Sequence, residues 1–337
     1  RSCLQMIDII RSFTDRYSAK SLKKLLLCSK CKKKVDLSTF KDYMSMEDRK
    51  TDYDHLRMFE KSVNTIVETG WDRRTRVDGD IREFVPNGSS TIENSRKKHG
   101  NWLKSGNPFS PIAKVISVPA TGKDRIVSIF SESMSILRPS HKALYDSISR
   151  YNTVKRGEFS RQDVQKIMDS GKGKLVSGDY SSATDNIKRS YVDVVVKVLL
   201  EKSRYIGKEE RDALAQFGRV IDSEDGREWM KGQPMGSLMS FPILCIWNMA
   251  LFQLALDQEF RRLSIGFKEW SKYEYRVNGD DIAFRELVEG GMLYDNWRKN
   301  CEMAGVIVNE EKTGVDDKIV ELNSKTYING EKVKTIN

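Results

Sequence analysis

The chain has 337 residues and a formal net charge of +10, because 58 lysine and arginine residues exceed 48 aspartate and glutamate residues. This length can bury a substantial core, so a small peptide module is excluded and one large domain or several subdomains are expected. The positive charge favours a polyanionic partner such as nucleic acid or an anionic membrane surface.

The first third of the chain is polar and rich in lysine. Seven lysines lie within residues 20–34, and a group of three basic residues occupies positions 96–98. Two interpretations stay open. These segments are either a solvated face or a surface that guides RNA by binding phosphates without reading sequence.

The five cysteines are scattered, which argues against a disulfide framework and favours a reducing compartment. Cys28 and Cys31 have the spacing of zinc ligands, but no second pair accompanies them, so we do not expect a zinc site. Because the chain begins with Arg1 rather than methionine, we expect a fragment or a processed product.

Residues 112–129 predict a β-hairpin. Two runs rich in valine and isoleucine flank a Pro/Gly segment, the pattern of two strands joined by a turn. Lys114, Lys123 and Arg125 lie on or beside this hairpin, either as exposed strand charges or as ligands for phosphate.

A strand over residues 174–180 and a helix over residues 191–202 with a Val/Leu face come next. A glycine-rich loop at residues 232–236 leads into an apolar run, residues 238–256, which approaches the length of a membrane span. Because this run contains a proline and several polar residues, we expect a buried helix and no integral membrane segment.

The last third predicts a hairpin that carries carboxylates. Strand-like runs at residues 273–278 and 282–285 flank Gly279-Asp280-Asp281. A helix near residues 292–303, a strand at residues 305–308 and a hairpin around Asn329-Gly330 follow. Strands and helices mix without a regular βαβ rhythm, so the predicted fold class is α+β.

These carboxylates suit nucleotidyl transfer. Joining a nucleotide to an RNA end requires a 3′-hydroxyl to lose its proton and a pyrophosphate to leave, and two Mg²⁺ ions about 3.5–4 Å apart stabilise both charges. Such hard cations need carboxylates on rigid elements. Asp179 ends one predicted strand and Asp280-Asp281 lie in a turn between two others. Each of these acidic segments alone is typical of a surface turn. The order in which such segments follow one another along the chain is what makes a catalytic site the better interpretation.

That order resembles viral RNA-dependent RNA polymerases. Residues 177–185 look like motif A, residues 232–236 with Ser240 and Asn248 like motif B, residues 277–281 like motif C, and residues 309–313 like the lysine-bearing end of motif D. Residues 321–323 stand where motif E is expected. Within this superfamily of positive-strand RNA virus replicases, residues 141–150 and 156–157 are most similar to the ourmiavirus, narnavirus and mitovirus group. The resemblance covers roughly residues 112–330.

The resemblance implies a right-hand polymerase with a three-stranded antiparallel palm sheet backed by helices, fingers, and a short or missing thumb. One departure is Ser237, which follows Gly236 where a larger apolar residue is more usual. The implied domains are an N-terminal extension with part of the fingers (1–110), fingers with the basic motif F hairpin (111–173), palm with motif A (174–200), a fingers insertion (201–231), palm with motifs B, C and D (232–316), and the motif E hairpin with the start of a thumb (317–337).

The resemblance also implies a metal site for two Mg²⁺ or Mn²⁺ ions. Asp179 and Asp280 would be the metal ligands, with Asp281 and Tyr180 completing the site. Lys312 is a candidate general acid for the leaving pyrophosphate, and a surface lysine is the competing interpretation.

A nucleotide site is implied beside the metals. Asp185 would accept a hydrogen bond from the ribose and Asn248 would orient it, while Ser240 offers a hydroxyl and Gly236 lets the backbone approach the ligand. Alternatively, Ser240 and Asn248 are satisfied polar groups of a buried helix. The residues that match motif F, which clamps the triphosphate, are Lys114, Lys123 and Arg125.

The implied partners are an RNA template, the product strand and ribonucleoside triphosphates, inside a host cell and in the cytoplasm rather than the mitochondrion. A reverse transcriptase is one alternative, but it excludes the ribose hydroxyl with a bulky aromatic residue, where this chain has Ala183, Thr184 and Asp185. A non-catalytic basic RNA-binding protein is the other alternative. It would not require four carboxylates, whose charges oppose RNA binding unless metals neutralise them.

Overall fold

The computed structural model describes residues 36–77, 80–81, 90–95, 97, 107–119 and 124–333. Several sequence predictions therefore lie outside the described residues: the lysines of segment 20–34, the Cys28 and Cys31 pair, Arg96 and Lys98, and Lys123 of the basic hairpin.

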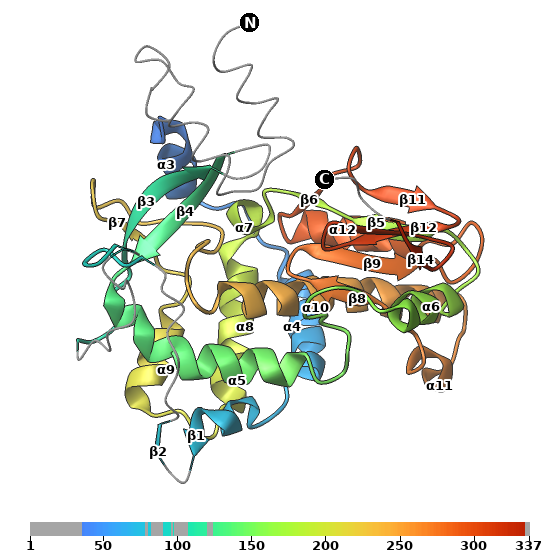
Figure 1. Ribbon diagram of the computed structural model, residues 1–337, viewed down its shortest axis with the longest axis horizontal. Coiled ribbons are helices and arrows are strands. Elements are labelled where there is room, and N and C mark those ends of the chain that lie inside the picture. Colours follow the sequence, from blue (N-terminus) through green and yellow to red (C-terminus); the bar gives the residue numbers. More distant parts are fainter. Residues whose placement is uncertain are drawn as a thin grey trace, which may run out of the picture.

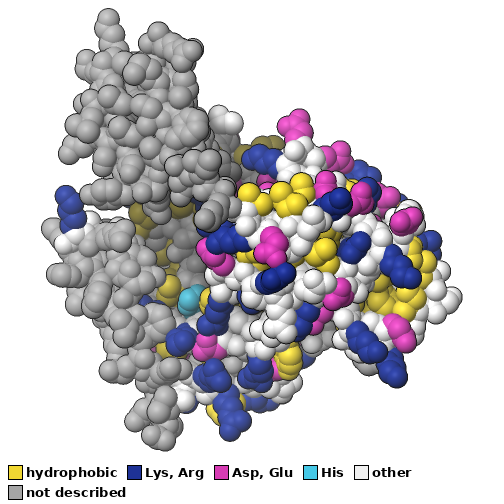
Figure 2. Space-filling model, turned by 45° about the vertical axis from the view of Figure 1, so that its right-hand side comes forward, with side chains coloured by type: hydrophobic (Ala, Val, Ile, Leu, Met, Phe, Trp, Pro, Cys, Tyr) yellow, Lys and Arg dark blue, Asp and Glu magenta, His cyan; other side chains and the backbone are white. Residues whose placement is uncertain are grey.

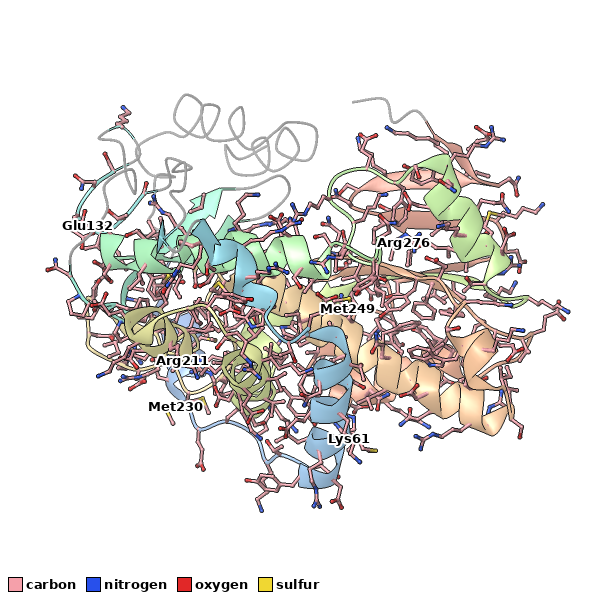
Figure 3. The ribbon with its side chains drawn as sticks, turned by 90° about the horizontal axis from the view of Figure 1, so that it is seen from below. Lys61, Glu132, Arg211, Met230, Met249 and Arg276 are labelled. Atoms are coloured by element: carbon pink, nitrogen blue, oxygen red, sulfur yellow. The ribbon has the colours of Figure 1, made fainter. Side chains whose placement is uncertain are left out.

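Helix α10 (Ser240–Arg262) forms the centre of the molecule. It is apolar on nearly all sides and largely buried, as expected for a helix surrounded by protein. Figure 3 shows Met249 of this helix lying between Lys61 of α4 (Tyr53–Ile66) and Arg276. By length and composition α10 could cross a membrane, but 78% of its apolar window is buried inside the protein, as in core helices of soluble proteins. The prediction of a buried helix is confirmed.

Three further helices pack against α10: α5 (Arg138–Ile148), α8 (Arg189–Lys202) and α12 (Leu293–Met303). The helices predicted over residues 191–202 and 292–303 are thus confirmed. Pro139 at the first turn of α5 is tolerated because the amide it lacks has no partner inside a helix.

The central sheet is antiparallel, with the strand order β11 (Gly314–Asp316), β5 (Leu175–Gly178), β9 (Asp281–Arg285) and β8 (Arg276–Asn278). The expectation of three strands is therefore wrong, because β11 adds a fourth at the edge beside β5. Nothing in the short, exposed sequence of β11 separates it from a loop, since it buries almost no apolar side chain.

Alternation along the sheet divides its side chains between two cores. In β9, Ile282 and Phe284 join the main core around α10 and α12, whereas Ala283 joins a smaller core on the opposite face. In β5, Val176 and Leu175 divide in the same way. This period of two is the geometry of a strand covered on both faces.

The smaller core is covered by α6 (Arg161–Asp169) and by a C-terminal sheet of β12 (Ile319–Leu322), β13 (Lys325–Ile328) and β14 (Glu331–Lys332). Asn329-Gly330 join β13 to β14, so the hairpin predicted there is confirmed. In Figure 1 this sheet and the central sheet lie together at the right, against α10 and α12.

A second region, at the left in Figure 1, contains the basic hairpin. Strands β3 (Ile112–Pro119) and β4 (Asp124–Phe130) pair antiparallel, which confirms the predicted hairpin, and β7 (Ile221–Asp222) pairs parallel with β3. The remaining elements are α3 (Ser38–Ser45), η1 (Trp71–Thr75), β1 (Arg76–Val77), β2 (Asp80–Ile81), η4 (Glu132–Leu137), β6 (Tyr180–Ser181), α7 (Ala183–Asn186), α9 (Lys208–Ala215), α11 (Phe267–Trp270) and β10 (Ile307–Val308).

Candidate active site

The turn between β8 and β9 presents a carboxylate to solvent. Asn278 pairs with Asp281, which leaves Gly279 and Asp280 as the two turn residues, and Asp280 is exposed. Gly279 has φ +64°, and a Cβ there would lie 2.9 Å from the ring of Phe241. Glycine is required for both reasons, and the predicted hairpin with carboxylates at its turn is confirmed.

Helix α10 forms hydrogen bonds with the main chain of this turn. The N–H of Gly279 donates to Sγ of Cys245 at 3.3 Å, and its carbonyl accepts from Nδ2 of Asn248 at 3.0 Å. Oδ1 of Asn248 accepts from the hydroxyl of Tyr180 at 2.6 Å. Asn248 therefore ties the turn of one hairpin to the strand that follows Asp179.

These contacts involve two of the predicted site residues. Asn248 is fully buried and both ends of its amide are hydrogen-bonded within the protein, so in this structure it supports the turn, as its alternative interpretation of a satisfied polar group expects. Tyr180 is 5% exposed, and its hydroxyl also accepts from the Trp297 indole at 3.2 Å. The phenol of Tyr180 therefore points into the core, so its backbone carbonyl is the group through which the predicted metal contact would be made.

Asp179 follows β5 at the level of the turn. Gly178 pairs with Ile282, so the next position of the antiparallel register sets Asp179 beside Asp281. Oδ1 of Asp179 accepts from the N–H of Tyr180 at 2.9 Å. Gly178 is required here because a Cβ would lie 2.5 Å from the Trp297 ring and 2.7 Å from Ile282.

The three carboxylates interact electrostatically. Burial, together with the charges of Asp280, Asp179 and Glu321, raises the pKa of Asp281 to about 7, against one hydrogen bond from the Asn323 N–H. Such mutual repulsion is relieved by a bound cation. Within the described ranges, no group of three or more His, Cys, Asp or Glu side chains is already arranged to hold a metal ion.

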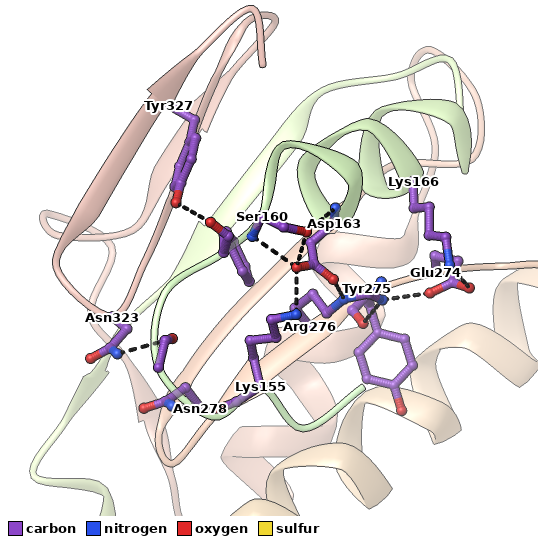
Figure 4. A network of polar contacts seen from close by, with 12 residues as sticks. Lys155, Ser160, Asp163, Lys166, Glu274, Tyr275, Arg276, Asn278, Asn323 and Tyr327 are labelled. Atoms are coloured by element: carbon purple, nitrogen blue, oxygen red, sulfur yellow. Dashed lines mark hydrogen bonds and ion pairs between the residues drawn. The ribbon is translucent and has the colours of Figure 1, made fainter. Parts of the chain in front are cut away.

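A salt-bridge network holds β8 from the other side (Figure 4). The buried guanidinium of Arg276 pairs with Asp163 at 3.1 Å, and Asp163 also pairs with Lys155 at 2.5 Å. Burial alone would raise the pKa of Asp163, but hydrogen bonds from Lys155 and Ser160 hold it well below its usual range. The carbonyl of Lys155 accepts from Nδ2 of Asn278 at 2.7 Å, which connects this network to the Gly279-Asp280 turn.

Asp185 lies half-buried on the short helix α7, after Ser182 with φ 48°. The glycine-rich loop holds this helix in place, since the N–H of Gln233 donates to the Thr184 carbonyl at 2.8 Å. Gly232 has φ +68°, and a Cβ there would lie 2.6 Å from the same carbonyl. The loop thus fixes α7 and with it Asp185.

The same loop reaches the basic hairpin. A Cβ at Gly236 would lie 2.0 Å from the Ser128 carbonyl, so the close approach that requires glycine is to β4. The Ser128 N–H donates to the Met235 carbonyl at 2.9 Å. The Ser240 hydroxyl donates to the Pro234 carbonyl, a contact within the loop.

The structure does not bring the two described basic residues of the hairpin together. Both side chains are exposed, but Lys114 pairs with Ile129 and Arg125 with Val118. Four residues of strand separate the two positions, roughly 13 Å. The charge of Lys114 acts instead on Glu224, whose pKa it helps to lower.

Lys312 is exposed on the turn between β10 and β11. This turn lies beside Asp179, because the Asn309 N–H donates to the Asp179 carbonyl at 2.9 Å and Thr313 Oγ1 accepts from the Asp179 N–H at 3.2 Å. Sequence reasoning missed Thr313 and Asn323. The dipeptide Asn323-Ser324 is a recognisable turn signal, but no local pattern reveals that its amide reaches Asp281.

Comparisons with known proteins find similarity of sequence and of fold. No family model matches the sequence. The RNA-dependent RNA polymerase of Ourmia melon virus (isolate Melon/Iran/VE9) is 33% identical over 169 residues, which are 45% of this chain and 19% of that protein. The chain thus spans about a fifth of the length of this curated relative.

Two solved structures resemble most of this chain in fold. The RNA-dependent RNA polymerase of a human picorbirnavirus aligns with a TM-score of 0.57 and 13% identity over 87% of this chain and 60% of its own. Its insertion loop deletion mutant aligns with a TM-score of 0.55, also at 13% identity, over 87% of this chain and 62% of its own. The chain is therefore similar in sequence to an ourmiavirus polymerase and has the α+β fold of viral RNA-dependent RNA polymerases.

Proposed function

We propose that this chain is the catalytic core of an RNA-dependent RNA polymerase that replicates a viral positive-strand RNA genome. One observation carries the proposal: the register of the central sheet sets Asp179 beside Asp281, next to Asp280 in the turn. A protein that only binds RNA has no need for three neighbouring carboxylates, whereas a metal-dependent polymerase uses them to hold its ions.

Two Mg²⁺ or Mn²⁺ ions suit this donor set, because carboxylate oxygens are the ligands that hard cations prefer. Asp179 and Asp280 would hold them, with Asp281 as an auxiliary ligand. When bound, the ions would make the 3′-hydroxyl easier to deprotonate and neutralise the leaving pyrophosphate.

The other residues of the site would act on the nucleotide. Asp185 would accept a hydrogen bond from the ribose, in a position fixed by the glycine-rich loop. Arg125, with Lys123 and Lys114, would bind the triphosphate from the basic hairpin, and Lys312 would donate a proton to the pyrophosphate.

The partners would be an RNA template, its product strand and ribonucleoside triphosphates, in the cytoplasm of the host cell. We propose that residues 111–173 and 201–231 form fingers with residues 1–110, that residues 174–200 and 232–316 form the palm, and that residues 317–337 begin a short thumb.

The direct test is incorporation of labelled ribonucleotide on an RNA template with Mg²⁺ or Mn²⁺. The change Asp280→Asn should cut incorporation by orders of magnitude while RNA binding and thermal unfolding stay normal, because metals rather than the fold are lost. Asp317→Asn is the matched control, since this carboxylate is exposed and pairs with Lys174 at the surface. Near-normal turnover by the Asp280 variant would remove it from the metal site.

The same assay distinguishes the alternatives. A reverse transcriptase would prefer deoxyribonucleotides, and a non-catalytic RNA-binding protein would incorporate neither. Ala183 and Thr184, next to Asp185, are small and buried, so no bulky aromatic side chain guards the sugar at these positions.

A further inference from the structure

Two faces of helix α5 have different surroundings. On one face, Tyr145 packs edge-on against Phe241, with ring centroids 5.5 Å apart, and Phe241 lies under the catalytic turn at Gly279. The opposite face, with Ala143 and Ser147, lines a cavity of about 500 Å³ between α5 and η1, and Arg150, just after the helix, lines it as well. This cavity is therefore separated from the candidate active site by the width of a helix.

The cavity is strongly cationic, and we call it the arginine recess. Its charged lining residues are four arginines, Arg73, Arg74, Arg76 and Arg150, against the single acid Glu68. Lys and Arg side chains gather along the lower part of the face in Figure 2, at the level of β1 and α5 in Figure 1. Such an excess of one sign concentrates an anionic ligand.

Three of these arginines are open to a ligand. Within the described part of the chain, Arg73 is exposed and has no ion-pair partner. Arg74 is 61% exposed and 3.6 Å from Asp146, and Arg150 is 55% exposed and 3.2 Å from Glu68. The Arg150 pair is largely exposed and therefore weak, and Asp146, which is 12% exposed, also pairs with Arg156 at 2.8 Å, so a phosphate could take the place of either carboxylate at its arginine. Arg76 is not available to a ligand in this way, because it forms a salt bridge with the buried Glu210. It stabilises the side of the arginine recess instead.

Exposed tyrosines flank the arginine recess. Tyr151 is 65% exposed, and its hydroxyl donates to Glu68. Tyr205 is 44% exposed, and its ring would lie 3.6 Å from a Cβ at Gly70, which lines the recess. Aromatic rings beside a cationic groove are the combination that binds single-stranded nucleic acid, since bases stack on the rings and phosphates pair with the cations.

We propose that the arginine recess binds a stretch of single-stranded RNA, outside the catalytic cleft and without sequence preference. The inference rests on the proposed function for the identity of the polymer. Arg73, Arg74 and Arg150 contact backbone phosphates, and Tyr151 and Tyr205 stack on bases. The recess retains a strand that is longer than the catalytic site alone can hold.

The test is fluorescence anisotropy of the full chain with a labelled single-stranded RNA, across a salt series and without nucleotides. In the double variant Arg73→Gln, Arg150→Gln the slope of log affinity against log salt should flatten by about 0.7 for each phosphate that no longer pairs with an arginine. Lys268→Gln, Lys272→Gln is the matched control, because both lysines are exposed on or beside α11, at the opposite side of Figure 1.

A second variant tests stacking separately. Tyr151→Ala, Tyr205→Ala should weaken binding about tenfold at constant salt slope, whereas Tyr53→Ala, at the start of α4 and 73% exposed, should not. The proposal is overturned if the recess variants match their controls, or if free ribonucleoside triphosphate displaces the RNA from the recess as readily as unlabelled RNA does.

An assay of nucleotide addition on a short primer–template distinguishes failure of the arginine recess proposal from failure of the proposed polymerase function. Normal addition by the recess variants, with weakened binding of long RNA, supports the recess. Loss of addition in the unaltered chain, with recess-dependent RNA binding intact, would refute the polymerase and leave the recess standing as an RNA site.

Discussion

The backbone N–H of Asn323 donates a hydrogen bond of 3.1 Å to Oδ2 of Asp281. Asn323 and Ser324, with φ of 51° and 57°, form the two-residue turn between β12 and β13. The Asn323 side chain also donates to the Gly157 carbonyl at 3.3 Å. The turn of the C-terminal sheet therefore orients a carboxylate that belongs to the turn of the central sheet.

This relationship predicts that Asn323→Pro slows nucleotide addition by about tenfold or more, because proline removes the N–H and a hydrogen bond to a charged group is lost. Asn323→Gly keeps both the N–H and the left-handed conformation, so it should retain most activity. Initial rates at saturating nucleotide measure the difference.

The control for backbone disturbance is Asn329→Pro. Asn329 has φ 50° and lies in the next turn of the same sheet, where its N–H donates to the Lys318 carbonyl. Equal losses in Asn323→Pro and Asn329→Pro would mean that the sheet is merely disrupted, and the specific link to Asp281 would be abandoned.

A second prediction concerns sugar selection by Asp185. The change Asp185→Ala should reduce the preference for ribonucleotides over deoxyribonucleotides by about tenfold or more, since a site built to bind a hydroxyl discriminates strongly against its absence. The measurement is the ratio of kcat/KM for the two nucleotides. Asp212→Ala, an exposed position on α9, is the control. An unchanged ratio would place sugar recognition elsewhere.

A third prediction concerns the salt-bridge network below β8. Arg276→Met should lower the free energy of unfolding by about 3–5 kcal/mol, because it leaves Asp163 and Glu274 without their buried partner. Urea denaturation measures this loss. Arg161→Met removes an arginine that is 81% exposed and pairs with Glu331, so its cost should stay below about 1 kcal/mol. Similar losses in the two variants would contradict the prediction.

A fourth prediction concerns pH and His55. This buried histidine bonds to the Tyr191 hydroxyl and to Oδ1 of Asn300, and burial lowers its pKa. The unfolded chain, with an ordinary histidine pKa of about 6.5, then binds a proton that the folded protein does not. Stability should therefore fall as pH drops below about 6.5.

Unfolding by urea between pH 5.5 and 7.5 measures this dependence. His55→Asn should flatten the slope without abolishing it, because burial also lowers the pKa of His141. Other titrating groups cancel in the comparison of variant with unaltered protein. Identical slopes would show that His55 does not titrate differently on folding.

Much of the central architecture could be predicted from the sequence. The side chains of β9 alternate between the two faces of the sheet, and Gly279-Asp280 form a tight turn. Both features can be recognised from a few neighbouring residues, because a strand has a period of two and a turn with positive φ favours glycine. The basic hairpin and the helices α8, α10 and α12 follow from patterns of the same kind. The order of the acidic segments then indicated which strands had to meet.

Other features depended on tertiary packing. Because α10 is apolar on nearly all sides, its sequence has no periodicity to indicate which way Asn248 faces. The sequence did not indicate that the phenol of Tyr180 is buried, because its partners Asn248 and Trp297 are distant along the chain. The separation of Lys114 from Arg125 was set by the register of the hairpin.

Glycine at position 178 has a mechanical consequence. A Cβ there would lie 2.5 Å from the Trp297 indole and 2.7 Å from Ile282 of the neighbouring strand, so these two side chains occupy the space that a larger residue would need. The indole, on α12, thus helps to set the spacing between the strand that ends just before Asp179 and the strand that begins at Asp281. A change at Trp297 would therefore alter the alignment of these two carboxylates as well as the packing of the core.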